Sequence, residues 1–262
     1  MKISVVIRNK NQVEALSFLL NNLNTRYATQ IDEVIVIDNL SKDGSQDIAK
    51  QYGARVVTIQ NFSYGRSANL AASSANSEIV VLFSAHSYPV SHDFFNLIKK
   101  TFENDSNLAG VRCLHNASDY RNYIKEIHPK KNPNTSGLIF SGSAFKRSVW
   151  QKLPFKENVA TFEDKEWSRR VLSLGYHIAL VPAIFCYEIK RTKSQNYFRF
   201  KNDLVGNYQL WGTAPSWKGT FWGLLKGFLC LGYNVLIDIY YLLKRFFRRL
   251  GFLINKPSEL KP

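Results

Sequence analysis

Short, continuously apolar segments alternate with helical patterns along the first third of the chain, and this alternation constrains the fold more than any other feature. The apolar segments are residues 3–7, 34–38, 56–59 and 79–83. Helical spacings of apolar residues and helix-start signals lie between them. Strands that are apolar on both faces and alternate with helices form a mainly parallel sheet with helices on both sides. We therefore predict an α/β fold with a Rossmann-like sheet.

Local signals predict the boundaries of several elements. Asn11 and Glu14 have the spacing of a capping box, which places the start of the first helix at Asn11. Further along, we expect a polar loop over 115–136, a strand over 137–145, a helix from Glu163 to Gly175 and a strand over 177–181. Gly142, within the strand predicted over 137–145, is expected to permit a close approach of another part of the chain.

Polar and charged residues follow the predicted strands. Arg8 comes after the first strand, Asp38 ends the second, and Ser84 follows the fourth. Ligands of parallel α/β sheets bind beyond the carboxyl ends of the strands, so these positions are candidates for a site. Glu163 and Asp164 form a second polar group, at the start of a predicted helix. Carboxylates at a helix start are often simple caps, so their meaning depends on the motifs around them.

Five motifs, taken in order, resemble those of family 2 glycosyltransferases of the GT-A fold. They are residues 4–9 (SVVIRN), 36–45 (VIDNLSKDGS), 62–69 (FSYGRSAN), 142–147 (GSAFKR) and 163–167 (EDKEW). The resemblance extends over residues 3–190, and the stretch 62–66 is similar to rhamnosyltransferase-like members. It implies a GT-A fold and the transfer of a sugar from a nucleoside-diphosphate sugar to an acceptor hydroxyl.

The resemblance also implies roles for individual residues. Asp164 would be the base that takes the proton of the acceptor hydroxyl, and Glu163 would orient the acceptor. Trp167, one helical turn later, would either contact a sugar on the acceptor side or fill the core, and core packing is favoured. For Asp38, the alternative to a role in donor binding is capping of the turn after the strand. For Arg66, the alternative is a solvent-facing position on the helix. The residues implied on the donor side are Arg8, Asp38, Arg66, Asn69, Ser84 and His86.

The sequence departs from the family at the metal site. Members carry an Asp-x-Asp pair after the fourth strand, which holds a divalent cation against the diphosphate, and this chain has Ser84-Ala85-His86 there. A metal-binding histidine that members often place near Glu188 is also missing. Hydroxyl groups and neutral imidazole are poor ligands for Mg²⁺, which prefers charged oxygen. The Mg²⁺ or Mn²⁺ ion implied by the resemblance is therefore in question.

Three outcomes stay open at this position. His86 and Glu188 could hold a softer ion such as Mn²⁺. His86 and cationic side chains, with Arg66, Arg191 and Lys193 as candidates, could instead stabilise the leaving diphosphate directly. Finally, the site could be inactive, which would make the protein a catalytically silent scaffold that binds nucleotide sugar or partners. We rank cation-assisted, weakly metal-dependent catalysis first, because the predicted base is retained.

Basic charge is concentrated in the last part of the chain. The net charge is +15, and nine of these excess charges fall after residue 190, together with 15 of the 36 aromatic residues. The uncharged run 227–237 is shorter than the roughly 20 residues of a simple membrane span. One helical face carries Leu236, Ile239, Leu243, Phe246, Phe247 and Leu250, and another carries Asp238, Arg245 and Arg249.

This pattern predicts a catalytic domain over 1–190 and a helical region over 191–262 that lies on an anionic membrane surface. Packing of the same helix on its own domain or on a partner is the alternative. The expected protein is an inverting glycosyltransferase, attached peripherally at the cytoplasmic face of the membrane, with a glycan or lipid-linked acceptor in bacterial surface polysaccharide synthesis. Residues 1–7 lack signal-peptide features, which favours the cytosolic side. A nucleic-acid partner is not expected, because the basic residues are mixed with many apolar ones.

Overall fold

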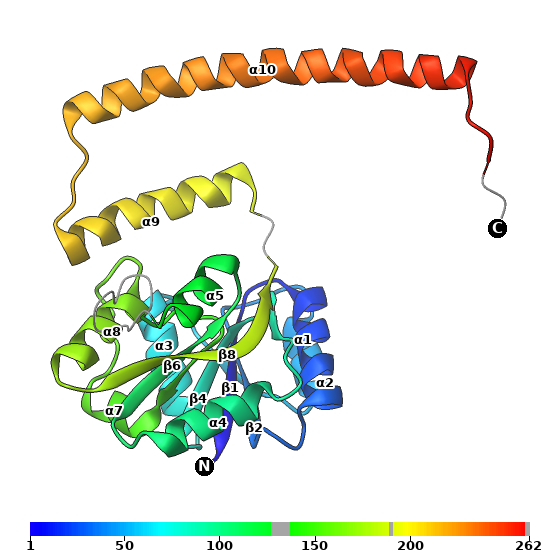
Figure 1. Ribbon diagram of the computed structural model, residues 1–262. Helices are drawn as coiled ribbons and strands as arrows, with labels where there is room; N and C mark the ends of the chain where they lie inside the picture. The colour runs from blue at the N-terminus through cyan, green and yellow to red at the C-terminus, as the bar shows by residue number, and fades with distance from the viewer. Residues whose placement is uncertain (127–136, 189–190, 260–262) are drawn as a thin grey trace. The chain divides into compact units, whose positions relative to one another are not determined.

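The computed structural model describes residues 1–126, 137–188 and 191–259. Helices and strands alternate through most of this range (Figure 1). In chain order, the elements are β1 (Ile3–Asn9), α1 (Val13–Arg26), β2 (Glu33–Asp38), α2 (Ser45–Gln51), β3 (Arg55–Thr58), α3 (Tyr64–Ser74), β4 (Ile79–Ser84), β5 (Ser87–Pro89), α4 (Phe94–Asn104), β6 (Leu108–Leu114), α5 (Ala117–Ile124), β7 (Ser143–Lys146), α7 (Arg147–Lys152), α8 (Glu163–Ser173), β8 (His177–Tyr187), α9 (Lys193–Trp211) and α10 (Trp217–Ile254).

Within the described residues, eight strands form one sheet in the order β3-β2-β1-β4-β7-β6-β8-β5. β3, β2, β1 and β4 are parallel neighbours, and β6 is parallel to β8. β7 is antiparallel to β4 and β6, which lie on either side of it, and β5 is antiparallel to β8. The prediction of a mainly parallel sheet is confirmed, with antiparallel pairs in the half of the sheet that the sequence pattern left least defined.

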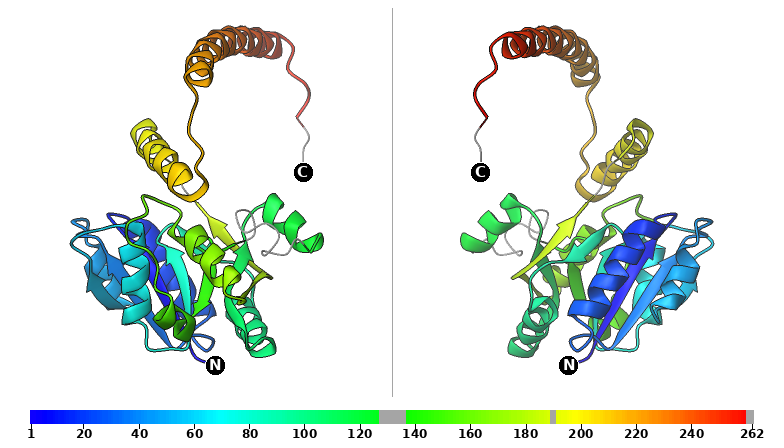
Figure 2. Two further views of the ribbon diagram at one scale, coloured as in Figure 1. Left: turned by 90° about the vertical axis from the view of Figure 1, so that its left-hand side faces the viewer. Right: turned by 90° about the vertical axis from the view of Figure 1, so that its right-hand side faces the viewer.

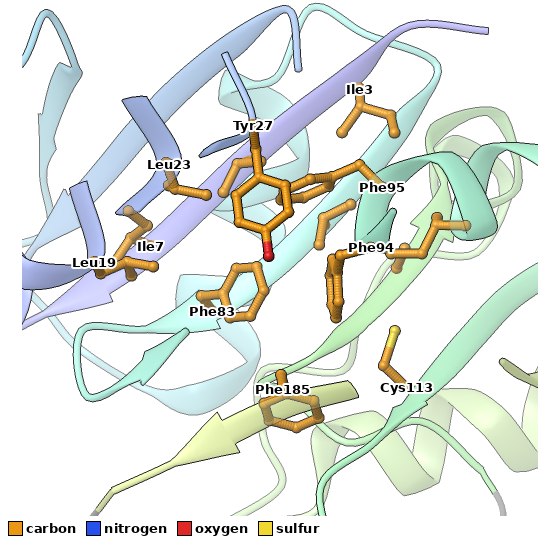
Figure 3. Packing of buried hydrophobic residues seen from close by; sticks show 14 of the residues in the cluster. Ile3, Ile7, Leu19, Leu23, Tyr27, Phe83, Phe94, Phe95, Cys113 and Phe185 are labelled. Carbon is orange, nitrogen blue, oxygen red and sulfur yellow. The ribbon is translucent and has the colours of Figure 1, made fainter. Parts of the chain in front are cut away.

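Buried side chains on the two faces of the sheet form two apolar cores. Alternate residues of β1 enter different cores, Val5 and Ile7 one and Val6 the other, because successive side chains of a strand point to opposite faces. The first core also receives α1, α2 and α4, and Figure 3 shows Phe83 and Phe95 within it. The second receives α3, α7 and α8. Helices therefore cover both faces of the sheet (Figure 2).

The first helix does not begin with the predicted capping box. α1 begins at Val13, with Gln12 in the N-cap position and no capping bond from its side chain. Asn11 has a left-handed φ of 49°, and its side-chain oxygen accepts a hydrogen bond from the Lys42 backbone N–H at 2.8 Å. The Val13 backbone N–H donates instead to Asp43 Oδ2, at 2.9 Å. The loop after β2 thus supplies the cap, which ties the loops after β1 and β2 together.

Other boundaries differ after residue 111. Part of the predicted loop over 115–136 is the helix α5, which begins where the Asn116 side chain accepts hydrogen bonds from the backbone N–H groups of Ser118 and Asp119. Residues 127–136 of that loop lie outside the described part of the chain. The strand predicted over 137–145 is limited to β7, and β8 continues to Tyr187, well past the predicted end at 181.

Gly142 does permit the close approach that was expected. It has a left-handed φ of 69°, and a Cβ atom added there would lie 2.0 Å from the Phe185 ring. Glycine is the residue that adopts this conformation without a steric cost. Its backbone N–H donates to the Leu82 carbonyl and its own carbonyl accepts from the Cys113 N–H, at 2.8 Å each, so it joins β4 to β6 just before β7 begins.

The chain divides into two compact units, Met1–Gly212 and Thr213–Pro262. This boundary falls later than the expected one at residue 190, because α9 packs on the first unit. Gly206 of α9 is buried, and a Cβ atom there would lie 2.6 Å from Thr161 and 2.9 Å from Phe162. The second unit contains α10, a continuous helix of 38 residues with none of them buried.

Candidate active site

The carboxyl ends of β1, β2 and β4 lie side by side. The strand register pairs Asn9 of β1 with Asp38 of β2, and Arg8 of β1 with Ser84 of β4. Three of the predicted site residues therefore meet at one edge of the parallel half of the sheet. This is the edge at which α/β sheets bind ligands.

Asp38 lies at the centre of a closed hydrogen-bond network. Its carboxylate is fully buried and accepts bonds from the Ser41 N–H at 2.9 Å, Asn9 Nδ2 at 3.0 Å and Gln46 Nε2 at 2.8 Å. Burial alone would raise the pKa of Asp38, but these hydrogen bonds outweigh burial and hold the pKa below its usual value. Asp38 therefore orders the loop after β2, as the turn-capping alternative expects, and its role toward a nucleotide stays a prediction.

Arg8 and Glu163 form a buried ion pair beside this edge. Arg8 Nη1 lies 3.5 Å from Glu163 Oε1, and the two side chains are 15% and 4% exposed. Nη1 also donates to Ser67 Oγ at 3.1 Å. The guanidinium carbon lies 3.0 Å from the centroid of the Phe140 ring, in a cation–π contact. The first strand and the start of α8 are thus joined through one arginine.

Two carboxylates occupy the start of α8, and both are perturbed. Burial, followed by the neighbouring charge of Asp164, raises the pKa of Glu163 to about 7, although Arg8 acts in the opposite direction. Burial also raises the pKa of Asp164, against the hydrogen bond that its Oδ1 accepts from the Lys165 N–H at 2.7 Å. Carboxylates with raised pKa values are better matched to proton transfer near neutral pH.

The residue before this pair has a strained backbone that the sequence patterns did not reveal. Phe162 has a left-handed φ of 65°, which is uncommon for a bulky side chain. Its ring contacts the Trp211 ring of α9, with 5.3 Å between centroids, and Gly206 of α9 also packs closely against it. Strained conformations persist where the surroundings fix them, often at functional sites. α9 therefore fixes the point from which Glu163 and Asp164 project.

Ser84 ends β4 and His86 follows it, where the sequence resemblance predicts the Asp-x-Asp pair. Ser84 Oγ lies 2.7 Å from Ser141 Oγ. His86 Nδ1 lies 2.9 Å from Gln12 Oε1, and its Nε2 is buried with no hydrogen-bond partner among the described residues. Burial, and then the charges of Arg191 and Arg8, lower the pKa of His86 to about 4. In this ligand-free site, His86 is therefore neutral at physiological pH.

The remaining metal candidate, Glu188, has a different neighbour. Its carboxylate accepts a hydrogen bond from the Tyr88 hydroxyl at 3.2 Å, and only its backbone N–H contacts His86, through the carbonyl oxygen at 2.9 Å. No group of three or more His, Cys, Asp or Glu side chains suited to a metal occurs in the described residues. A neutral imidazole and serine hydroxyls do not make the carboxylate-rich donor set that Mg²⁺ or Mn²⁺ takes, so these residues do not fit a family-type metal site.

Arg66 and Asn69 are engaged with another segment of the chain. Arg66 Nε lies 3.0 Å from Glu157 Oε2, and Asn69 Nδ2 donates to Glu157 Oε1 at 3.0 Å. Asn69 Oδ1 accepts from Trp150 Nε1 and from the Phe155 N–H, at 2.9 Å each. The amide of Asn69 is thus fully used in holding the segment before α8, and its expected place on the donor side stays a prediction. Arg66 keeps half of its side chain exposed, at 52%.

Trp167 belongs to the core and not to the acceptor side. It is 0% exposed, and its Nε1 donates to the Leu153 carbonyl at 2.6 Å. The ring is stacked on Phe155 with 5.3 Å between centroids. Because the indole has no exposed surface, it cannot contact a sugar, and the core-packing alternative holds.

Comparison with known proteins agrees with this geometry. Residues 4–167 match the family model described as glycosyl transferase family 2. The chain is 30% identical over 193 residues to the O-antigen chain rhamnosyltransferase WbaN of Salmonella anatum, over 66% of this chain and 59% of that protein. The chain thus spans less than two thirds of the length of this relative.

Solved structures share the fold at low identity. One is the mannosyltransferase PcManGT from Pyrobaculum calidifontis, in complex with GDP-Man and Mn²⁺, with a TM-score of 0.65 and 17% identity over 82% of this chain and 65% of that one. Another is glucosyl-3-phosphoglycerate synthase from Mycobacterium tuberculosis, in complex with Mn²⁺, UDP and glucosyl-3-phosphoglycerate, with a TM-score of 0.60 and 17% identity over 82% of this chain and 81% of that one. The first unit has the GT-A fold, and the chain belongs to glycosyl transferase family 2.

Proposed function

We propose that the protein transfers a sugar from a nucleoside-diphosphate sugar to a hydroxyl of a glycan acceptor, with inversion at the anomeric carbon. The observation that carries the proposal is the carboxylate pair at the start of α8, beside a buried arginine at the carboxyl ends of the parallel strands. Family membership and the similarity to an O-antigen rhamnosyltransferase support a role in surface polysaccharide synthesis.

In the proposed step, the acceptor oxygen attacks the anomeric carbon from the side opposite the diphosphate. The carbon–oxygen bond to the diphosphate breaks, and the diphosphate leaves with the bonding electrons. Asp164 takes the proton of the acceptor hydroxyl, which is general-base catalysis. A single displacement of this kind inverts the configuration. Glu163 is held by Arg8 and orients the acceptor side of the site.

The first test is binding and transfer with a donor panel. UDP, GDP, dTDP and their sugars are titrated by calorimetry, and transfer to a lipid-linked glycan is then followed with the donor whose nucleotide binds. We expect one nucleotide to bind clearly more tightly than the others and its sugar to be transferred. Binding without transfer from any sugar of that nucleotide would favour the silent scaffold, and absence of binding would remove the enzyme proposal.

Membrane attachment through α10 is the second part of the proposal. By length and composition, α10 is the one candidate for a membrane span among the described residues. At about 1.5 Å per residue it is about 57 Å long, roughly twice the ~30 Å hydrocarbon thickness that a span has to match. Lys244, Arg245, Arg248 and Arg249 also gather within six positions near its end. A helix that lies along the interface buries its whole apolar face and keeps these cations near lipid phosphates, so we favour peripheral attachment at the cytoplasmic face.

Reversing two of these charges should release the protein from anionic vesicles. Each basic residue near such a surface contributes about 1 kcal/mol, so Arg245→Glu with Arg249→Glu should weaken binding by about 4 kcal/mol, or roughly a thousandfold. The measurement is co-sedimentation with phosphatidylserine-containing vesicles. The matched control is Lys50→Glu with Lys100→Glu, two exposed lysines of the first unit, which should bind as the wild type does. Retention of the tail variant through an alkaline wash would instead indicate a spanning helix.

A further inference from the structure

A positive side chain stands beside the position at which the family binds its metal. Arg8 and Ser84 are paired residues of the neighbouring strands β1 and β4, and the Ala85 N–H donates to the Arg8 carbonyl at 2.9 Å. Where the sequence resemblance predicts the Asp-x-Asp pair, residues 84–86 carry no carboxylate, and an arginine lies on the adjacent strand. Both changes shift the local charge in the same direction, from negative to positive.

The guanidinium of Arg8 is fixed in place, and only one of its nitrogens donates hydrogen bonds among the described residues. The Phe140 ring covers it at 3.0 Å, and the Tyr64 ring lies 5.5 Å away. Among the described residues, its hydrogen bonds to Ser67 and Glu163 both come from Nη1. Burial lowers the pKa of Arg8, yet an arginine stays protonated in proteins. The N–H groups of Nε and Nη2 therefore remain available to a ligand, and the side chain keeps 15% of its surface exposed.

The counterion of Arg8 compensates its charge only in part. Burial raises the pKa of Glu163 to about 7, so this carboxyl holds its negative charge less firmly than an ordinary glutamate does. Arg191 is close enough to lower the pKa of His86, as Arg8 does. A divalent cation placed here would meet positive charge and no carboxylate of the Asp-x-Asp type. A diphosphate would meet a positive field with donors arranged for phosphate oxygens.

We propose that Arg8 takes the place of the divalent cation, so that it binds the leaving diphosphate and makes sugar transfer independent of metal. This inference rests on the proposed glycosyltransferase function and assigns the source of positive charge within it. The sequence pattern named Arg66, Arg191 and Lys193 as candidate cations, and the proposal gives this role to Arg8. A guanidinium can bind two phosphate oxygens at once, and in a water-poor site its charge acts more strongly than in water.

The step is balanced without any further reactant. The bond between the anomeric carbon and the diphosphate oxygen breaks, and the diphosphate gains the negative charge that Arg8 meets through its free N–H groups. The new bond forms between the anomeric carbon and the acceptor oxygen, whose proton goes to Asp164. Charge develops on the leaving oxygen in the transition state, so the interaction with Arg8 strengthens there and accelerates the reaction.

The test compares the full-length wild type with Arg8→Met and Arg8→Lys, each assayed in EDTA and again with Mn²⁺. We expect wild-type transfer in EDTA, a loss of about 10²–10³-fold in kcat for Arg8→Met, and a smaller loss for Arg8→Lys, which keeps the charge but loses the fork geometry. Methylguanidinium added to an Arg8→Ala variant should restore part of the activity. Binding of UDP against UMP, GDP against GMP and dTDP against dTMP should lose its preference for the diphosphate in Arg8→Met.

A matched control keeps loss of folding separate from loss of function. Arg147→Met removes another half-buried arginine, whose Nε bonds the Ala72 carbonyl at 3.2 Å, and it should retain activity and nucleotide preference. Rescue by methylguanidinium also requires a folded Arg8 variant. Wild-type transfer that is abolished by EDTA and restored by Mn²⁺ would overturn the role of Arg8 and leave the glycosyltransferase intact. Full activity of Arg8→Met in EDTA would overturn it as well. Absence of both binding and transfer in the wild type would overturn the proposed function, and this inference with it.

Discussion

Replacing Asp164 with asparagine should lower kcat by about 10²–10⁴-fold, the range that a positioned general base contributes. Asparagine has the same shape, and its side-chain oxygen can still accept the hydrogen bond from the Lys165 N–H. The site should therefore keep its geometry and its affinity for the nucleoside diphosphate. Initial transfer rates at saturating donor measure the loss, and calorimetry with the same nucleotide measures the retained binding.

Two further variants show whether the effect belongs to Asp164. Asp105→Asn changes a carboxylate that bonds His177 at 2.7 Å, at the start of β8, and should leave transfer unchanged. Glu163→Gln should reduce transfer less than Asp164→Asn does, because the proposal gives Glu163 an orienting role. The opposite order would assign the base to Glu163. Normal transfer in both α8 variants would show that neither carboxylate acts as a base.

Replacing Trp167 with alanine should destabilise the first unit by about 3–5 kcal/mol, as expected for the loss of a large, fully buried aromatic side chain. The indole is 0% exposed, and its stacking on Phe155 and its hydrogen bond to the Leu153 carbonyl are lost together. The free energy of unfolding from urea titration, followed by circular dichroism, measures the effect. Because ordinary domains are stable by only about 5–15 kcal/mol, the variant should unfold at a much lower urea concentration.

Trp217→Ala is the matched control for this prediction. Trp217 is the first residue of α10, is 84% exposed, and its loss should leave the unfolding of the first unit unchanged. Trp167→Phe should fall between the wild type and Trp167→Ala, because the ring can still stack while the hydrogen bond is lost. A stable Trp167→Ala variant that had lost only acceptor affinity would return Trp167 to the acceptor side.

The parallel half of the fold could be predicted from the sequence because its signals are local. A continuously apolar segment such as 79–83 is a buried strand in almost any context, and polar residues at the ends of such strands then meet at one edge. The capping box predicted at Asn11 was wrong because the actual cap comes from a distant part of the chain. A better-placed acceptor, Asp43, comes from a loop 30 residues later, and nothing in the sequence around Asn11 indicates it.

The roles of Arg66 and Asn69 depend on contacts that are distant in the chain. Their positions at the start of α3 suited a phosphate site, but Glu157 and Phe155 reach them from about 90 positions later. The strained backbone of Phe162 depends on α9 in the same way. Arg8 is the reverse case, because the sequence marked it only as a donor-side residue, while its pairing with Ser84 becomes visible only once the strand register is known.

The exposed apolar side chains of α10 have a consequence for any measurement of size in solution. These large side chains are between 36% exposed, at Ile237, and 84% exposed, at Trp217. Apolar surfaces of this extent drive soluble proteins together when nothing else covers them. Without lipid or detergent, the full chain is therefore expected to form concentration-dependent aggregates or micelle-like clusters. An oligomeric state determined in such a buffer would report the colloidal behaviour of this helix and not the stoichiometry of the enzyme.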